Sequence, residues 1–382
     1  MQVRRIVLVV VALSAGMTGC GSGDAPSAST TAAASGSTPT VTSGSTPIAH
    51  LSASANAAAA RFLDRYVTSD GRVIRHDQGG DVVSEGQAYG MLIAEVARRP
   101  ALVRTIWSWT SAHLGRSDGL LSWHATGRGQ VEDPEPAADA DVLIAYALLR
   151  YRGADQAALR SAGRRVAQAV LANESVALPG GAPLVVAGPW ARTVAATVDP
   201  SHLMPGVFDA LARFTGDGRW RRAAVAAVTL IGEMTGDGRR LPPDWSRLSG
   251  SRLVPIAAPG GSAGVQYGLD AARLPLWFAT ACQPSARSLA AGWWRNVLSS
   301  GDRSAPLALS LSGATINPDS SPLTLLAGAA AATAAGDLGA ARRLRARAAT
   351  VARRFPTYYG EAWAALGPAL LDGAISPCSS SD

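Results

Sequence analysis

The sequence predicts an all-α fold, an (α/α)6 barrel in which six inner and six outer helices form a toroid. Hydrophobic residues make up 47% of the 382 residues and aromatic residues only 6%, a composition that suits closely packed helices better than a β-rich sandwich. Apolar side chains recur at spacings of three and four residues along most of the chain, and strand patterns are scarce. A chain of this length can bury one large core.

Twelve segments carry the helical spacing, and prolines or glycine-rich joints separate them. The expected helices lie near 50–67, 86–97, 101–114, 138–151, 155–173, 200–214, 217–234, 262–281, 285–300, 320–335, 338–354 and 358–372.

These segments alternate in character. Residues 139–151 and 323–335 are apolar nearly all round, as in a buried helix, whereas 158–171 and 339–355 carry arginines along one side, as in a helix that faces water. The alternation predicts six buried helices inside six amphipathic ones. One rim, where function usually sits, is expected to form from the long irregular stretches 115–137, 174–199 and 235–261.

The N-terminus has the pattern of an export signal. Residues 1–20 place two arginines before an apolar run and then small residues, and Met17 to Cys20 have the spacing of a lipobox. We expect export, with lipid attached to Cys20 as the protein's contact with the membrane; an ordinary signal peptide or an uncleaved anchor is the alternative. The Ser-, Thr-, Ala- and Gly-rich residues 21–46 should form a disordered tether, which leaves 47–382 as the folded domain.

The charge pattern argues against nucleic-acid binding. The net charge is +7, but the arginines are scattered over helix faces without the interleaved aromatic side chains that such binding needs. The histidines and cysteines form no cluster that suggests a metal, and we expect a monomer without metal or cofactor. In an exported chain Cys282 and Cys378 could form a disulfide, and two free buried thiols are the alternative.

Glu85 is the first candidate for chemistry. It stands at the start of a predicted helix in the stretch VVSEGQAYGMLIAEVARR, where Ser84 and Gln87 have the spacing of a capping box. Glu85 could therefore merely complement the helix dipole, which would stabilise its charge and lower its pKa. A group that donates a proton near neutral pH needs the opposite shift, so a catalytic role requires burial or a second carboxylate nearby.

Other acids could supply that partner. Asp139 and Asp141 begin an apolar helix and point to different sides of it, so at most one should share a site with Glu85; Asp139 could instead be an N-cap. Asp270 lies in an otherwise apolar stretch, three residues before Arg273, and buried acids are rarely left unpaired.

Aromatic side chains could stack on flat sugar rings in a glycosidase cleft. For Trp107, Trp109 and Trp277, which lie at helical spacing, we prefer a role in core packing. The candidates for binding substrate are Trp123, Trp190, Trp245, Tyr267, Tyr358 and Tyr359, together with Arg273.

Several segments in order resemble those of glycoside hydrolase family 8, and in particular of bacterial endoglucanases associated with cellulose synthesis. SEGQAYGM at 84–91 resembles the motif around that family's proton-donating glutamate, ADADVLIAYALL at 138–149 its signature segment, and DAARLP at 270–275 the segment with the catalytic base. Further similar segments are DGLLSW at 118–123, DPSHLMP at 199–205, PPDW at 242–245 and the tyrosine pair 358–359.

The resemblance implies an inverting endo-acting β-1,4-glucanase, a cellulase, with residues 47–382 as its (α/α)6 catalytic domain. Glu85 would be the general acid, Asp270 the base that activates water, and Asp139 the residue that holds the distorted sugar and the water. An inverting enzyme needs its two carboxyls roughly 6.5–9.5 Å apart so that water fits between them. The resemblance also makes a cellulose-like β-glucan the substrate and a cellulose-synthase complex a candidate partner.

The chain departs from the family pattern at Ala138, Leu269, His124 and His202, which bears on the affinity for substrate more than on the reaction type. Two alternatives remain open at this point. One is a non-catalytic glucan-binding or cell-wall scaffold protein on the same barrel. The other is a related hydrolase of xylan, chitosan or a mixed-linkage glucan.

Overall fold

The computed structural model describes residues 53–301 and 305–378. The expected signal peptide, the lipidation site Cys20 and the tether at 21–46 lie outside the described residues.

Within these residues the chain forms twelve α-helices, and alternate helices lie inside and outside a ring. The inner helices are α2 (Ser84–Val96), α4 (Ala138–Arg150), α6 (Pro205–Thr215), α8 (Leu274–Ala279), α10 (Pro322–Ala334) and α12 (Tyr358–Leu371). The outer helices are α1 (Ala53–Tyr66), α3 (Pro100–His113), α5 (Gln156–Asn173), α7 (Gly218–Thr235), α9 (Pro284–Asn296) and α11 (Leu338–Arg354).

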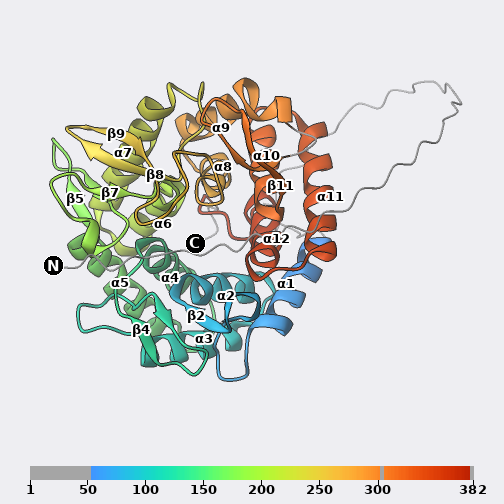
Figure 1. The fold of residues 1–382 in the computed structure, drawn as a ribbon. Helices are drawn as coiled ribbons and strands as arrows, with labels where there is room; N and C mark the ends of the chain where they lie inside the picture. Colours follow the sequence, from blue (N-terminus) through green and yellow to red (C-terminus); the bar gives the residue numbers. More distant parts are fainter. Residues whose placement is uncertain (1–52, 302–304, 379–382) are drawn as a thin grey trace, which may run out of the picture.

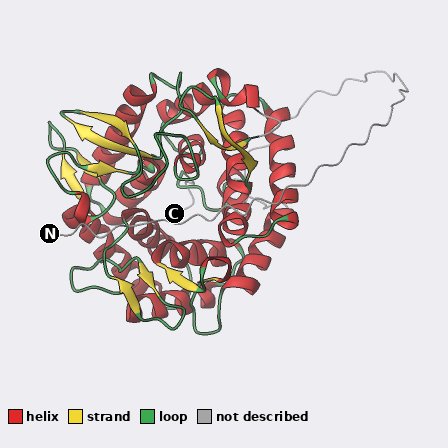
Figure 2. Ribbon diagram, in the orientation of Figure 1, coloured by secondary structure: helices red, strands yellow, loops and turns green. Residues whose placement is uncertain are grey.

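The inner ring is closed. Each inner helix contacts the next, and α12 returns to contact α2, while every outer helix packs against an inner neighbour. Figure 1 looks down this ring and shows the outer helices around it, and Figure 2 shows helices dominating the view. The (α/α)6 barrel expected from the sequence is therefore the observed fold.

Burial explains why the alternation in the sequence predicts the two layers. Nearly every side chain of α4 and α10 is buried, whereas α11 exposes arginines and buries chiefly alanines and Leu344. Small residues allow the layers to approach closely: a Cβ on Gly163 of α5 would lie only 2.9 Å from the Leu149 side chain. An outer helix with a small-residue stripe thus seals the apolar inner helix behind it.

Two of the predicted helices differ from the structure. The segment expected at 262–281 is helical only from Ala271, with a 3-10 turn η4 (Ala271–Arg273) leading into the short α8. Glycine and proline at 259–264 and Gly268 favour turns before that point. The segment expected at 200–214 is a 3-10 turn η3 (Pro200–His202) followed by α6, because Pro205 begins a new helix.

Short strands line the irregular stretches. They are β1 (Ile74–Arg75), β2 (Asp81–Val83), β3 (His124–Ala125), β4 (Val131–Asp133), β5 (Ser175–Ala177), β6 (Pro183–Val185), β7 (Thr197–Val198), β8 (Trp245–Ser249), β9 (Arg252–Ile256), β10 (Pro306–Leu309) and β11 (Thr315–Ser320). All pair antiparallel, in the orders β1-β2-β3-β4, β5-β6, β7-β8-β9 and β10-β11.

The three irregular stretches meet the beginnings of inner helices, as the predicted rim requires. The amide of Ser84, which opens α2, donates to the Trp123 carbonyl at 2.9 Å, and that of Ala138, which opens α4, donates to the Ala187 carbonyl at 3.2 Å. Asp244 accepts from the amide of Ala271 at 2.9 Å, just before α8. These rim stretches therefore lie at the N-terminal ends of α2, α4 and α8.

The C-terminal segment after α12 is tied to the barrel by a disulfide between Cys282 and Cys378, whose Cα atoms are 5.2 Å apart. The disulfide excludes the two free buried thiols that the sequence left open as the alternative. The Ile375 carbonyl also accepts from the Tyr146 hydroxyl at 3.0 Å, near the end of α4 that lies away from Asp139. Among the described residues, no helix is long and apolar enough to cross a membrane.

The disulfide closes a chain segment of 96 residues, so we expect its removal to lower stability by restoring freedom to the unfolded chain. The double variant Cys282→Ser/Cys378→Ser should lose about 2–4 kcal/mol of unfolding free energy in urea titrations under oxidising conditions. Reductant should lower the stability of the natural sequence by a similar amount and leave the variant unchanged. Equal stability of the two oxidised proteins would contradict the structural role of this bond.

Candidate active site

One buried guanidinium gathers four carboxyl groups. Arg273 is only 5% exposed. Its Nη1 donates to Glu85 at 2.7 Å and to Asp139 at 2.9 Å. Its Nη2 donates to Asp199 at 3.0 Å and to Asp270 at 3.3 Å. The three acids singled out in the sequence therefore meet at one cation, together with a fourth that was not singled out.

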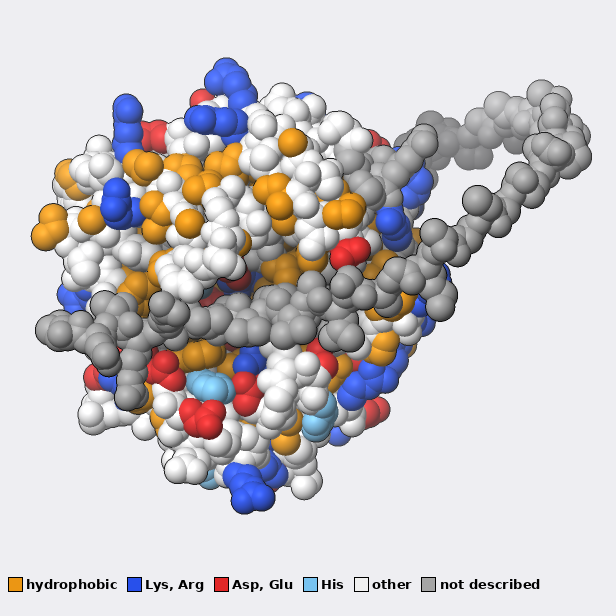
Figure 3. All heavy atoms as spheres, in the orientation of Figure 1, with side chains coloured by type: hydrophobic (Ala, Val, Ile, Leu, Met, Phe, Trp, Pro, Cys, Tyr) orange, Lys and Arg blue, Asp and Glu red, His pale blue; other side chains and the backbone are white. Residues whose placement is uncertain are grey.

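The inner helices bring these acids together. Glu85 lies in the first turn of α2 and Asp139 in the first turn of α4, while Asp199 precedes η3 before α6 and Asp270 precedes η4 before α8. Since all four side chains reach the same guanidinium, the N-terminal ends of these four helices lie at one end of the ring. Figure 3 shows acidic, arginine and histidine side chains near the middle of the face that it presents.

The capping box expected at Ser84 and Gln87 is wrong. The N-cap of α2 is Val83, and no side chain caps this helix. Gln87 points to the preceding loop instead: its Oε1 accepts from the Val73 amide at 2.6 Å, and its Nε2 donates to the Gly71 carbonyl at 3.0 Å. The S-x-x-Q spacing therefore reflects a glutamine, Gln87, that anchors the preceding loop. The Glu85 carboxyl remains available to the site.

The N-cap alternative for Asp139 is also wrong, because Ala137 is the N-cap of α4. Asp139 faces Arg273, whereas Asp141 is fully buried on another side of the helix, as its spacing predicted. Burial raises the pKa of Asp141 and of Glu174 well above the ordinary value. The negative charges near each carboxyl raise its pKa further. These two acids are not part of the cluster on Arg273.

The environment of Glu85 suits a proton donor. Burial raises the pKa of Glu85, the Arg273 guanidinium opposes that shift, and the Asp139 carboxylate reinforces it. The Tyr89 hydroxyl and Arg273 both donate to Oε1, each at 2.7 Å, so Oε2 can carry a proton. Burial and a neighbouring acid thus supply the influence against the helix dipole that the sequence argument required.

The environment of Asp270 also raises the affinity of its carboxyl for a proton. Burial raises its pKa well above the ordinary value and Asp199 adds to the shift, while Arg273 opposes it. The two Nη atoms of a planar guanidinium are about 2.3 Å apart, so Oε1 of Glu85 and Oδ1 of Asp270 lie at most about 8.3 Å from each other. A single sugar linkage can therefore be reached by both carboxyls.

Two residues of the site were missed as functional candidates. Asp199 accepts from the Ser201 amide at 2.8 Å and from Arg273. Burial alone would raise the pKa of Asp199, but His202 and Arg273 hold it below the ordinary value. Nε2 of His202 lies 3.4 Å from Asp199 and 3.6 Å from Asp139. Burial lowers the pKa of His202, but these two carboxylates raise it by more, so the net shift is upward. In the sequence, DPSHLMP at 199–205 resembles a family segment and His202 departs from the family pattern, but neither observation indicates a contact with the catalytic acids.

The other departures from the family pattern have local explanations. His124 stacks on Trp123 with ring centroids 4.8 Å apart, and its Nε2 lies 2.9 Å from Asp81. Ala138 and Leu269 pack into the apolar core.

The candidate binding aromatics divide into two groups. Trp123, Trp190, Trp245 and Tyr359 are partly exposed, and the tryptophans come from the rim stretches as predicted. The core role preferred for Trp107, Trp109 and Trp277 is confirmed, since Trp109 and Trp277 are buried and Trp107 packs against the core.

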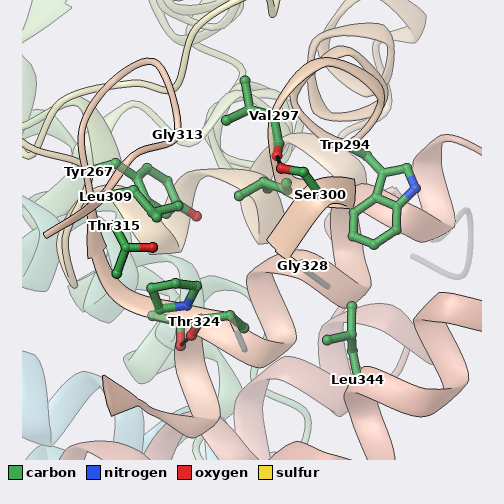
Figure 4. A pocket seen from close by; sticks show the side chains of 13 residues that line it. Tyr267, Trp294, Val297, Ser300, Leu309, Gly313, Thr315, Thr324, Gly328 and Leu344 are labelled. Carbon is green, nitrogen blue, oxygen red and sulfur yellow. Dashed lines mark hydrogen bonds between the residues drawn. The ribbon is translucent and has the colours of Figure 1, made fainter. Parts of the chain in front are cut away.

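For Tyr267 and Tyr358 the structure corrects the expected stacking role. Tyr358 is 1% exposed and packs edge-on against Tyr66. Tyr267 is 2% exposed, and Figure 4 shows its ring beside Leu309 at a separate cavity of about 190 Å³ between the β10 region and α9 to α11. Neither ring presents a face on which a sugar could lie.

Within residues 53–301 and 305–378, no group of three or more His, Cys, Asp or Glu side chains could hold a metal ion. The position at the centre of the acids belongs to Arg273. What the arrangement offers chemically is a pair of carboxyl groups with raised pKa, Glu85 and Asp270, on either side of a fixed cation.

Comparisons with known proteins agree with this arrangement. The model of glycosyl hydrolases family 8 matches residues 41–368. A probable endoglucanase of Novacetimonas hansenii is 31% identical over 241 residues, which cover 57% of this chain and 65% of that protein. An endoglucanase of Cellulomonas uda is 29% identical over 236 residues, which cover 58% and 63%. The matches thus span less than two thirds of these relatives.

Solved structures share the fold. The endo-beta-1,4-glucanase CMCax from Acetobacter xylinum matches with a TM-score of 0.68 and 24% identity over 85% of this chain and 99% of that chain. The beta-1,3-1,4-glucanase from Paenibacillus sp. X4 matches with a TM-score of 0.74 and 20% identity over 84% and 91%.

Removing the shared cation should make stability strongly dependent on pH. In Arg273→Met, the pKa values of Glu85, Asp199 and Asp270 rise, because Arg273 lowers each of them. The folded variant then holds protons that the unfolded chain releases, so its unfolding free energy falls as pH rises. We expect a deficit of about 3–5 kcal/mol at pH 8 that shrinks towards pH 5.

The measurement is denaturant unfolding at several pH values. Arg219→Met, which removes an ion pair with Asp217 at the surface, is the matched control and should cost less than about 1 kcal/mol at every pH. A deficit of Arg273→Met that stays constant from pH 5 to pH 8 would show that the guanidinium does not lower the pKa values of these acids.

Proposed function

The chain belongs to glycosyl hydrolases family 8, and we propose that it is an endo-acting hydrolase that cleaves internal β-1,4-glucosidic bonds of a cellulose-like glucan with inversion. The observation that carries this proposal is the meeting of Glu85, Asp139 and Asp270 around Arg273. These are the three acids that the family resemblance assigns to catalysis, and they come from segments far apart in the sequence.

Glu85 would protonate the oxygen of the leaving sugar. Its raised pKa allows it to hold a proton near neutral pH, and its free Oε2 is the atom from which the proton leaves. General acid catalysis of this kind requires the donor to lie within hydrogen-bond reach of the glycosidic oxygen.

Asp270 would take a proton from water as the water attacks the sugar from the opposite face. Burial and Asp199 raise the pKa of Asp270, so its ionised carboxylate binds a proton more strongly than an exposed aspartate would. The bond from Arg273 opposes that shift and favours the ionised form that a base requires. The upper limit of about 8.3 Å on the distance between these two oxygens leaves room for the lower part of the roughly 6.5–9.5 Å range that an inverting enzyme uses to accommodate water.

Asp139 would hold the distorted sugar and the attacking water. Its Oδ2 accepts from Arg273, and its Oδ1 accepts from the Ala140 amide at 2.9 Å. Trp123, Trp190, Trp245 and Tyr359 would bind neighbouring sugars, since each ring is partly exposed.

The protein is proposed to act outside the cytoplasm, tethered through lipid on Cys20. The arginines, apolar run and lipobox spacing of residues 1–20 support this. So does the Cys282–Cys378 disulfide, because such bonds persist in oxidising compartments. The similarity to endoglucanases associated with cellulose synthesis makes a cellulose-synthase complex the candidate partner.

Glu85→Gln and Asp270→Asn should each lower kcat on carboxymethylcellulose by about 10²–10⁴-fold, because each removes one proton-transfer group from the transition state. Viscosity loss measures internal cleavage, and thermal melts of both variants check that the barrel remains folded. A folded Glu85→Gln or Asp270→Asn variant with the turnover of the natural sequence would exclude that residue from its role.

If the natural sequence leaves carboxymethylcellulose intact, assays on xylan, chitosan and mixed-linkage glucan test the related activities.

Inversion predicts that the first-formed product is the α-anomer. Proton NMR of a soluble cello-oligosaccharide during early hydrolysis should show the α-anomeric signal before mutarotation mixes the forms, because water attacks from the face opposite the leaving group. A β-anomer as first product would instead require a covalent intermediate and a carboxyl separation of about 5–5.5 Å.

A further inference from the structure

The loop that carries Asp270 is held by one carboxylate from a different part of the chain. Oδ1 of Asp244 accepts from the amides of Gly268 and Ala271 at 2.8 and 2.9 Å. Its Oδ2 accepts from Nε2 of Gln266 at 3.1 Å, and its own amide donates to the Gln266 carbonyl at 2.8 Å. These contacts bracket Asp270 on both sides.

Asp270 occupies a position where an aspartate would usually bind its own backbone. It is the N-cap residue of η4, and aspartate is favoured there because its carboxylate accepts from the first amides of the helix. Yet the Asp270 side chain makes no cap hydrogen bond. Asp244 accepts from the Ala271 amide, while the Ala272 amide donates to the Gly268 carbonyl at 2.9 Å. With those amides satisfied, the Asp270 carboxyl is free to face Arg273.

The sequence around this contact is adapted to it. A Cβ on Gly268 would lie 2.5 Å from Oδ2 of Asp244 and 2.8 Å from Nε2 of Gln266. Only a residue without a side chain lets the carboxylate come close enough to accept from the Gly268 amide.

We propose that Asp244 is a positioning residue: it caps the backbone before α8 in place of Asp270 and so directs the Asp270 carboxyl into the active site. The proposal rests on the role of Asp270 as the base in the proposed function. Asp244 does not itself contact Arg273 or the other acids through any hydrogen bond found in the described residues.

Charge is a second consequence of this placement. Burial raises the pKa of Asp244 to about 6, against the lowering effect of the bonds from Ala271, Gln266 and Gly268. The charged groups that act on Asp270 are Asp199, Arg273, Asp244 and Glu85, and the Asp244 charge raises the pKa of Asp270. An asparagine at 244 would keep an acceptor for the two amides but remove this charge.

The test compares three variants of the full chain. Asp244→Ala removes the acceptor, and Gly268→Ala pushes it away. Asp244→Asn keeps an oxygen that can accept from both amides, and Gln266 can rotate its side-chain amide so that its oxygen accepts from the introduced NH2 group. Asp209→Ala is the matched control, because Asp209 is a partly buried acid that also accepts from a glutamine, Gln283 at 3.2 Å, away from the acids on Arg273. Two measurements are made: kcat and KM on carboxymethylcellulose, and amide hydrogen exchange in 266–273.

We expect kcat to fall about 10²-fold in Asp244→Ala and Gly268→Ala, because a displaced base no longer reaches the water, with KM within about twofold of the natural value. Both variants should lose exchange protection at 268–271. Asp244→Asn should recover most of kcat and of the protection, and Asp209→Ala should resemble the natural sequence.

Unchanged kcat and unchanged exchange in Asp244→Ala and Gly268→Ala would overturn the proposal. So would a loss of kcat in Asp244→Asn equal to that in Asp244→Ala, because charge and not backbone position would then matter. If Asp244→Ala fails to fold, Gly268→Ala decides, since it leaves the carboxylate in place. If the natural sequence hydrolyses no glucan, the proposed function fails by itself, and exchange at 268–271 still tests whether Asp244 holds the loop.

Discussion

The active site depends on one buried arginine. Four carboxyl groups at such short range repel each other strongly, and a guanidinium without acids would be costly to bury. Arg273 has five donors in a fixed plane, so it can bind several acids at once and set their relative positions. Its contacts reach acids at the N-terminal ends of α2, α4, α6 and α8, and the cation therefore ties four walls of the barrel together where chemistry is proposed to occur.

The direction of the inner helices creates this meeting point. Their N-terminal ends carry partial positive charge, which favours carboxylates there, while burial favours the protonated form. At Glu85 and Asp270 burial outweighs the attraction of Arg273, and at Asp199 two cationic neighbours outweigh burial. One cluster thus combines acids of different proton affinity, and the difference arises from the balance between burial and cationic neighbours at each carboxyl.

The fold was predictable because apolar periodicity is local. Segments such as 139–151 and 339–355 show their burial in their own residues, and eleven of the twelve expected segments are α-helical over more than half of their length within residues 53–301 and 305–378. The segment at 262–281 was mispredicted because a few glycines and a distant carboxylate, Asp244, decide its conformation.

The three acids could be found from motifs, but Asp199, His202 and the roles of Ser84 and Gln87 depend on contacts across the barrel, which spacing cannot reveal. Tyr267 and Tyr358 were misassigned for the same reason, since a motif does not show which way a ring points.

The closed ring has a consequence for how the chain reaches its native state. Helix α12 packs between α1 and α2 and also contacts α10, so the circle is complete only when the last helix meets the first two. Contacts between residues so far apart in sequence form slowly, because a long loop must close before they contribute. A polypeptide emerging end-first from a ribosome or threading through a secretion pore would therefore stay open until its final helix is released.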